Sequence, residues 1–420
     1  MKRVLMIAYH FPPLAGSSGI QRTLRFVQHL PAFGWEPAVL TADPRAYERT
    51  SHDLDADVPS QVRVERAFAL DAARHLSVAG RYPGFLARPD RWMTWQYAAI
   101  RAGSRLIRDW RPDVIWSTYP IATAHVIGNA LHRRSGLPWI ADFRDPMAQE
   151  GYPADPRVWR SFKRIEEEAL AGAQCSVFTT PGAARVYRER YPTFAARVEA
   201  IENGYDEESF AGIDAQAALR EPLNAGATTL LHSGIVYPSE RDPSHLFEAL
   251  ARLVEGGRLR RDSLKLRFRA SAHDDMLAGL ARRHGVEGMI ELLPPIPYRA
   301  ALEEMLRADA LLVLQASNCN EQIPAKLYEY LRAGRPMLAL TDPIGDTAGV
   351  VREAGIDSIA PLDNADAIAV GLLQFMDGLR AGTAARPDAD CIARASRRQR
   401  TLALAELLDR CQGAGRRSAT

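Results

Sequence analysis

The sequence predicts an α/β protein made of two doubly wound, Rossmann-like domains. Its 420 residues exceed what one hydrophobic core usually supports. Short apolar runs alternate with longer segments of helical periodicity, which is typical of a parallel sheet covered by helices. This alternation starts twice, with a weakly periodic segment in between. We therefore expect two facing domains, with the carboxyl ends of their strands at a shared ligand-binding crevice.

The first domain is expected to span residues 1–205. Its expected strands are the apolar runs VLMIAY, PAVLTA, DVIWST, PWIADF and CSVFTT, followed by VEAIENG. Helices are expected over about 19–33, 122–134 and 159–170, because apolar residues recur there at helical spacing. The chain then enters residues 206–227, which are rich in alanine, glycine and acids, as a linker would be.

The second domain is expected to span residues 228–390. Its expected strands are TTLLHSG, LKLRFRA, MIELLPP, ADALLVLQ and PMLAL, and its helices lie near 245–255, 275–284, 299–307 and 324–333. Residues 391–420 predict a C-terminal helix and a frayed tail. An apolar stripe on that helix can pack back on the N-terminal domain. The stripe consists of Leu402, Leu404, Leu407 and Leu408.

Charge and cysteine usage restrict the function classes. Fifty-three basic residues face fifty-one acidic ones, so no overall positive field favours nucleic acid. The four cysteines lie far apart, which fits a reducing cytoplasm and predicts neither a disulfide framework nor a metal site. No run approaches the ~20 apolar residues of a membrane span. Any membrane contact is expected to be peripheral, and no cofactor is expected.

The segment LLVLQASNCNEQIPAKLYEYLRAGRP carries the most informative pattern. Pro324 suits the first turn of a helix and Gly334 suits its C-terminal cap. The positive end of such a helix is a site for a diphosphate. Glu321 precedes the helix and Glu329 lies in it, where carboxylates can accept hydroxyl groups. The alternative is that either glutamate only complements the helix dipole.

Two glutamates with seven residues between them, followed by an Ala-Gly-Arg-Pro turn, resemble the donor motif of retaining GT-B glycosyltransferases, especially glycosyltransferase family 4. The resemblance implies glycosyl or hexosyl transfer from a nucleoside diphosphate sugar to a saccharide or lipid-linked saccharide. It implies that Glu321 contacts sugar hydroxyls and Glu329 the ribose. The amides around Gln322 and Ile323 would support sugar and phosphate. Lys326 either reaches the phosphates or is an exposed helix residue.

A second segment, LLHSGIVYPSERDP, resembles the family's phosphate-binding strand, loop and helix. Gly234 opens the loop. Arg241 stands where the family has a lysine, and arginine is a competent phosphate ligand. Ile235 stands where the family has an arginine, so one expected charge is absent, and Lys326 could replace it. The alternative is that Arg241 is a solvated loop residue.

The acceptor side is expected in the first domain. The loop YHFPPLAGSSGIQR resembles the family's glycine-rich loop, where Gly16 and Gly19 would allow the donor close to the backbone. His10 either helps binding or is a polar residue at a strand end.

Residues 138–146, PWIADFRDP, resemble a subgroup of bacterial family 4 enzymes that build surface polysaccharides. Asp142, Arg144 and Asp145 end a strand there and are candidates for acceptor positioning or proton removal. The alternative is an acid and base pair that ties loops together. Thr118 stands where many relatives carry a histidine, which leaves the residue nearest the reaction open.

A retaining transfer in this fold needs no side-chain nucleophile, because the leaving diphosphate can take the acceptor proton. The catalytic candidates are Glu321, Arg241, Lys326 and Asp142. If the enzyme inverts, Asp142 or Asp145 is the expected base. Two alternatives remain open: another GT-B enzyme, such as a nucleotide-sugar epimerase or a phosphorylase, and a non-catalytic protein that binds a sugar nucleotide.

An arginine-rich stretch, FLARPDRWMTWQYAAIRAGSRLIRDWRPD, allows two interpretations. Trp92, Trp95 and Tyr97 with neighbouring arginines could lie on an anionic membrane surface, at the inner face of the cell membrane. Alternatively, one face of a packed helix carries Trp95, Ala99, Leu106 and Ile107.

Overall fold

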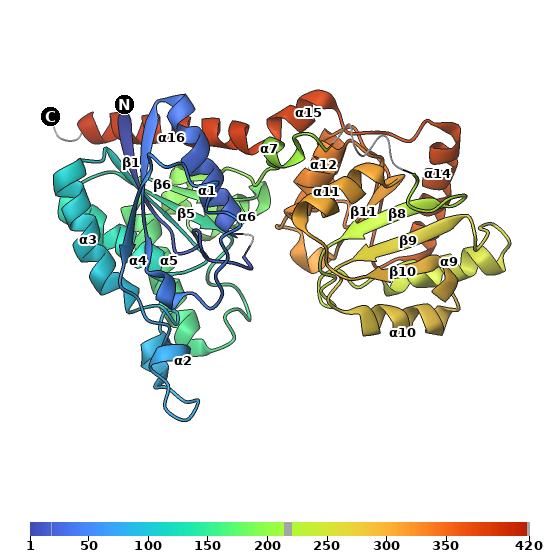
Figure 1. The fold of residues 1–420 in the computed structure, drawn as a ribbon, viewed down its shortest axis with the longest axis horizontal. Coiled ribbons are helices and arrows are strands. Elements are labelled where there is room, and N and C mark those ends of the chain that lie inside the picture. The colour runs from blue at the N-terminus through green and yellow to red at the C-terminus, as the bar shows by residue number, and fades with distance from the viewer. Residues whose placement is uncertain (18, 214–220, 418–420) are drawn as a thin grey trace. The chain divides into compact units, whose positions relative to one another are not determined.

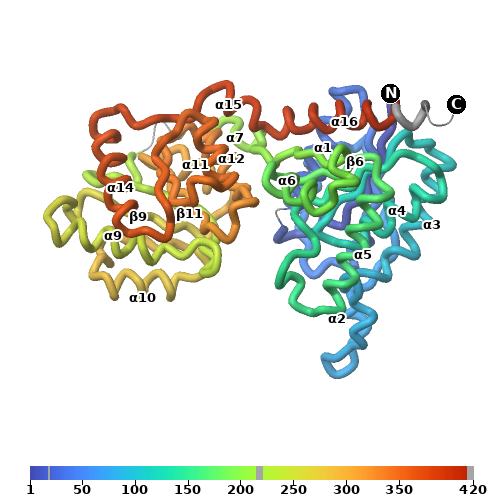
Figure 2. The backbone as a smooth tube through the Cα atoms, turned by 180° about the vertical axis from the view of Figure 1, so that it is seen from behind, coloured from blue at the N-terminus to red at the C-terminus, as the bar shows by residue number. Residues whose placement is uncertain are grey.

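The computed structural model describes residues 1–17, 19–213 and 221–417 of the chain. They form two compact units (Figures 1 and 2). The N-terminal unit comprises Met1–Glu202 together with the segment that begins at Arg397, and the C-terminal unit comprises Asn203–Ser396. Both units have a parallel sheet with helices on its two faces. The predicted α/β fold with two doubly wound domains is confirmed.

The sheet of the N-terminal unit has seven parallel strands in the order β3-β2-β1-β4-β5-β6-β7. The strands are β1 (Lys2–Ile7), β2 (Trp35–Ala42), β3 (Arg63–Ala67), β4 (Val114–Thr118), β5 (Trp139–Arg144), β6 (Cys175–Phe178) and β7 (Val198–Ala200). The chain runs outward from β1 in one direction and from β4 in the other. The two strands pair with Val4 opposite Val114.

Both faces of this sheet are covered, because alternate residues of each strand enter different cores. Leu5 and Ile7 pack with α3, α4, α5 and α6, whereas Val4 and Met6 pack with α1 and α16. The helices are α1 (Gly19–His29), α2 (Ala72–His75), α3 (Trp95–Trp110), α4 (Thr123–Ser135), α5 (Pro156–Gly172), α6 (Pro181–Arg190) and α16 (Arg397–Arg417). Short 3-10 helices lie at Leu30–Phe33, Pro44–Ala46, Gly84–Ala87 and Pro192–Arg197.

Helix α16 is the last element of the chain and packs beside α1, near the first strand (Figures 1 and 2). Leu404, Leu407 and Leu408 are buried in the same core as Val4 and Met6. The apolar stripe of this helix therefore belongs to the N-terminal unit, although the whole C-terminal unit separates the two in sequence.

Helix α3 shows the packed face of the arginine-rich stretch. Trp95, Ala99 and Leu106 are buried in the core, and Ile107 is partly buried against it. Tyr97 is exposed. Trp95 therefore follows the second interpretation, the packed helix face, because its ring is buried in the core of this unit. In the part of the chain that the structure describes, no helix is both long and apolar enough to span a membrane.

The sheet of the C-terminal unit has six parallel strands in the order β10-β9-β8-β11-β12-β13. The strands are β8 (Thr228–Ser233), β9 (Leu264–Arg269), β10 (Ile290–Leu293), β11 (Ala310–Gln315), β12 (Met337–Thr341) and β13 (Ile359–Ala360). One face packs against α9 (Ser244–Glu255), α10 (Asp274–His284) and α14 (Ala365–Ala381). The other packs against α7 (Glu207–Phe210), α11 (Tyr298–Arg307), α12 (Lys326–Ala333), α13 (Asp346–Glu353) and α15 (Ala389–Arg394). Further 3-10 helices lie at Glu287–Met289 and Ser317–Cys319.

The described part of the segment predicted as a linker, 206–227, packs onto the C-terminal unit. Phe210 and Ile213 are buried in its core, and Leu223 packs against that core. Glu207 forms an ion pair with Arg332 of α12 at 2.6 Å. Residues 214–220 lie outside the described residues. The C-terminal unit thus begins near Asn203 rather than at residue 228.

Candidate functional site

The sheet of the C-terminal unit reverses its direction of growth between β8 and β11. These two strands pair directly, with Leu230 opposite Ala310 and Leu231 opposite Leu311. Loops that follow such a pair diverge and leave a crevice at the carboxyl ends of the strands. The loop after β8 carries Gly234 and Arg241, and the loop after β11 leads into α12. All predicted donor-binding residues of this unit therefore belong to the loops and helices that follow these two strands.

Helix α12 begins at Lys326, two residues later than predicted. Pro324 is not in the helix, because its carbonyl accepts a hydrogen bond from the Leu327 amide in a turn that precedes it. The predicted cap at Gly334 is confirmed: it adopts φ +64° and its N–H bonds to the Leu331 carbonyl. No described side chain caps the first turn of this helix.

The two glutamates lie at the start of α12, as the sequence motif requires. Glu321 is half-buried in the turn before the helix, and Glu329 lies in its first turn. The Tyr298 hydroxyl of α11 donates a hydrogen bond to Glu329 Oε1 at 2.7 Å. Gln322 is exposed, while Ile323 is buried in the core. The Thr347 hydroxyl donates to the Gln322 carbonyl at 3.0 Å, which holds the loop.

Lys326 crosses from α12 to the end of β8. Its Nζ lies 2.9 Å from His232 Nε2. A Cβ at Gly234 would lie 3.1 Å from the same Nζ, and Gly234 adopts φ +109°. A side chain at residue 234 would therefore be strained and would crowd the lysine. The loop glycine and the helix lysine form one contact, so the structure brings these two predicted residues together.

Arg241 lies on the loop between β8 and α9, and neutral groups orient it. Its Nη1 donates to the Ile235 carbonyl at 2.9 Å, and its guanidinium stacks 5.1 Å from the Tyr237 ring centroid. Ile235 itself is 38% exposed, at the position where the family has an arginine. The backbone of Ile235, not its side chain, thus contributes to the placement of a cation.

The glycine-rich loop of the N-terminal unit lies against two of the predicted acceptor-side residues. A Cβ at Gly19 would lie 2.5 Å from His10 Nδ1 and 2.6 Å from Arg144 Nη1. The Ser17 hydroxyl lies 3.0 Å from His10 Nδ1, and Gly16 adopts φ +78°. Burial and the nearby Arg144 guanidinium lower the pKa of His10 to about 4. His10 is therefore neutral at physiological pH.

Asp142 does not reach the crevice as a proton acceptor would. Its side chain is completely buried, and Arg22 binds it through Nε at 3.1 Å and Nη2 at 2.8 Å. The Thr118 hydroxyl donates to the same carboxylate at 2.7 Å. Both carboxylate oxygens are therefore occupied. This geometry favours the alternative that Asp142 ties elements together, and its role in catalysis stays a prediction.

The other two residues predicted at this strand end, Arg144 and Asp145, are less buried than Asp142. Arg144 adopts φ +62° beside a register shift in β5, and its Nη1 donates to the Tyr119 carbonyl at 3.4 Å. Asp145 is exposed. Of the two aspartates predicted at this strand end, Asp142 is buried and Asp145 is the exposed residue.

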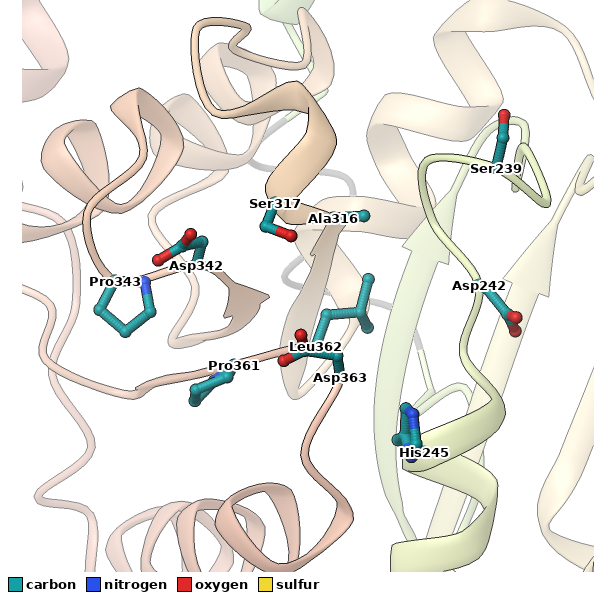
Figure 3. A pocket seen from close by; sticks show the side chains of 10 residues that line it. All are labelled: Ser239, Asp242, His245, Ala316, Ser317, Asp342, Pro343, Pro361, Leu362 and Asp363. Atoms are coloured by element: carbon teal, nitrogen blue, oxygen red, sulfur yellow. The ribbon is translucent and has the colours of Figure 1, made fainter.

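A cavity of about 420 Å³ opens at the carboxyl ends of β11, β12 and β13 (Figure 3). It is lined by Ser239, Asp242, His245, Ala316, Ser317, Asp342, Pro343, Pro361, Leu362 and Asp363. None of the predicted donor-binding residues lines it. Asp342 is held by Asn320 Nδ2 at 2.8 Å. The described residues contain no group of three histidine, cysteine or acidic side chains placed to hold a metal ion.

Three residues of these clusters were not predicted from the sequence. His232 lies inside an apolar strand, and a polar residue at such a position is the signal that could have identified it. Tyr298 opens the helix α11, and only the fold shows that it reaches Glu329. Arg22 was not distinguishable from a surface residue of α1, because its partner lies 120 positions away.

Comparisons with known proteins agree with this architecture. Residues 18–204 match the model of the glycosyl transferase 4-like domain. No curated protein matches the chain in sequence. Among solved structures, sucrose-phosphate synthase from Thermosynechococcus elongatus aligns with a TM-score of 0.61 and 16% identity, over 100% of this chain and 99% of that one. Anabaena HepE in complex with UDP aligns with a TM-score of 0.67 and 14% identity, over 97% and 100%. The trehalose 6-phosphate synthase of Burkholderia multivorans aligns with a TM-score of 0.64 and 13% identity, over 100% and 99%.

Proposed function

We propose that this chain transfers a sugar from a nucleoside diphosphate sugar. The premise is that it is a GT-B protein resembling glycosyltransferase family 4. The acceptor is a saccharide or a lipid-linked saccharide, and the transfer proceeds with retention. The resemblance also favours a role in bacterial surface polysaccharide synthesis at the inner face of the membrane. Because the HepE structures contain UDP and UDP-glucose, uridine nucleotides are the first donors to test.

The observation that carries the proposal is the group of residues at the ends of β8 and β11. Arg241 and Lys326 are the basic side chains there, and the positive end of the α12 dipole, which no described side chain caps, adds to them. Glu329 lies in the first turn of the same helix. This combination suits a diphosphate bonded to a ribose, whose hydroxyls donate to a carboxylate.

The chemistry then follows from stabilisation of the leaving group. The bond between the anomeric carbon and the phosphate oxygen breaks, and its electron pair remains on the diphosphate. The acceptor oxygen bonds to the same face of that carbon, and its proton passes to the departing phosphate. Arg241, Lys326 and the start of α12 would stabilise the charge that develops on the phosphate. Glu321 would hold the hydroxyls of the sugar.

Asp142 has no part in this proposal, because its carboxylate is buried and paired with Arg22. If the product were inverted, Asp145 would be the expected base, because it is exposed and Asp142 is not. The anomeric configuration of the product therefore distinguishes a retaining transfer from an inverting one.

The first test is nucleotide binding by thermal shift, with UDP, GDP, ADP and dTDP as probes. A nucleotide at about 100 times its Kd stabilises the folded state by about 2.7 kcal/mol, which is several degrees in Tm. We expect one of these nucleotides to give such a shift, and Glu329→Ala to abolish it. Glu353→Ala is the matched control, because Glu353 is exposed on α13.

The second test is turnover of the sugar nucleotide with and without acceptor lipid or oligosaccharide. Transfer requires a product that contains both the sugar and the acceptor, and the anomeric configuration of that product reports retention. Conversion of the donor to an isomer without any acceptor would support an epimerase instead. Tight binding without turnover of any donor would support a non-catalytic protein.

A further inference from the structure

We propose that Lys326 takes up a proton when a diphosphate binds, and that His232 positions the lysine amino group for this event. The proposal rests on the proposed function, since it requires a diphosphate in the C-terminal unit. It adds one property to that site: Lys326 becomes an ammonium ion only when the diphosphate binds beside it.

The hydrogen bonds of His232 define its protonation state. Its Nδ1 lies 3.0 Å from the Leu312 carbonyl of β11. A carbonyl only accepts, so Nδ1 carries the hydrogen, and the Nε2 of a neutral ring presents a lone pair. Lys326 Nζ lies 2.9 Å from this Nε2 and donates to it. The bond to Leu312 of β11 therefore fixes the imidazole ring, and the ring orients the amino group of Lys326.

The surroundings of Lys326 disfavour its charge when no ligand is bound. The titratable and charged groups that face it are His232 on β8, Arg241 on the following loop and Glu329 on α12. Burial first, and Arg241 second, hold the pKa of Lys326 well below its usual range, whereas Glu329 raises it. Burial also holds the pKa of His232 well below 6.5, so the imidazole does not compete for the proton.

A bound diphosphate reverses this balance. Its negative charges favour the ammonium form, which raises the pKa of Lys326 towards its usual value. At any pH between the two pKa values, binding therefore transfers one proton from the solvent to the amine. The resulting ammonium faces the phosphate, and it returns its proton when the nucleotide leaves.

The sign of the pH dependence follows from this linkage. Below the pKa of the ligand-free state, the amine is already charged and binding takes up no proton. Above that pKa, each increase in pH weakens diphosphate binding, because the amine must first be protonated. Lys326→Arg removes this dependence, because a guanidinium stays charged at all accessible pH values.

The test is isothermal titration calorimetry of the full chain with UDP, or with whichever diphosphate gives the largest thermal shift. Titrations at about pH 8 in buffers of different ionisation enthalpy give the number of protons exchanged; a nucleotide terminal phosphate, with a pKa near 6, is then fully ionised. We expect a net uptake of up to about one proton per bound nucleotide. Lys326→Arg should bind without uptake, and Lys326→Met should bind more weakly and without uptake.

The role of His232 is tested by replacing it with glutamine or with asparagine, whose side chains end in an amide. His232→Gln places a carbonyl oxygen near the position of Nε2 and keeps an acceptor for Lys326. His232→Asn can still donate to the Leu312 carbonyl but does not reach the lysine. We expect His232→Asn to raise the Kd for the diphosphate about tenfold, and His232→Gln to restore most of the affinity.

Each outcome is decisive for the proposal. A binding enthalpy of the wild-type chain that does not depend on the buffer would overturn it and leave the diphosphate site intact. An unchanged proton uptake in Lys326→Met would assign the proton to another group. Absence of binding by every diphosphate would overturn both this inference and the proposed function.

Discussion

Replacing Asp142 by alanine is expected to destabilise the N-terminal unit strongly. The change leaves the Arg22 guanidinium in a site where its side chain is only 3% exposed, without the carboxylate that it binds through two nitrogens. Removing one partner of a buried ion pair costs about 3 to 5 kcal/mol, since the remaining charge is then uncompensated. The Thr118 hydroxyl also loses one of its two acceptors and keeps the Tyr119 carbonyl at 3.0 Å.

Tryptophan fluorescence can follow this unit separately during urea unfolding. All seven tryptophans of the chain lie between residues 35 and 159, within the N-terminal unit. With a slope of about 2 kcal/mol per M of urea, a loss of 3 to 5 kcal/mol lowers the unfolding midpoint by about 1.5 to 2.5 M. The C-terminal unit contributes no tryptophan signal that could mask the change.

A double-mutant cycle provides the control. Arg22→Met removes the other partner, and the pair Arg22→Met with Asp142→Ala removes both charges. We expect the double variant to be more stable than the sum of the single losses predicts, by at least about 2 kcal/mol. If Asp142→Ala unfolds within about 0.3 M of wild type and yet loses all activity, the reasoning is refuted, and Asp142 must act on the substrate.

Two further substitutions test other parts of the structure. Gly234→Ala should weaken diphosphate binding about tenfold, because φ is +109° and the new Cβ would crowd Lys326 Nζ; Gly279→Ala on α10, where a Cβ meets nothing within 4 Å, is the control in the same calorimetric assay. Leu408→Ala should destabilise the N-terminal unit by about 2 to 5 kcal/mol in the tryptophan assay. Exposed Glu406→Ala should leave the midpoint unchanged, and equal effects of both changes would contradict the packing of α16.

The alternation of apolar runs and helical segments was sufficient to predict the fold class, because a buried parallel strand needs a continuous apolar run. Two strands were not expected, β3 and β13; β13 has only two residues, and the same rule explains why β3 was missed. β3 has the sequence RVERA and lies at the edge of its sheet, where only Ala67 is buried. An edge strand contacts one neighbour and tolerates charged residues, so its sequence carries little strand signal.

The matched domain model supports the resemblance to glycosyltransferase family 4 over residues 18–204, and the solved structures confirm the fold. It depended on the two glutamates and the Gly334 turn, which are local patterns. The partners of the site residues were not predictable in the same way. Arg22 and Asp142, or His232 and Lys326, come together only through the order of the strands, and their separation in sequence is about a hundred residues.

The basic side chains of the two units have different hydrogen-bond partners. This difference decides which of them can bind an anion. In the N-terminal unit, Arg22 meets the carboxylate of Asp142, so its charge is neutralised within the protein. In the C-terminal unit, Arg241 meets the carbonyl of Ile235 and Lys326 meets the neutral imidazole of His232. A neutral partner orients a cation without cancelling its charge. The C-terminal cluster is therefore oriented in advance for a diphosphate: Arg241 keeps its charge, and Lys326 gains a charge when the diphosphate binds, as proposed above.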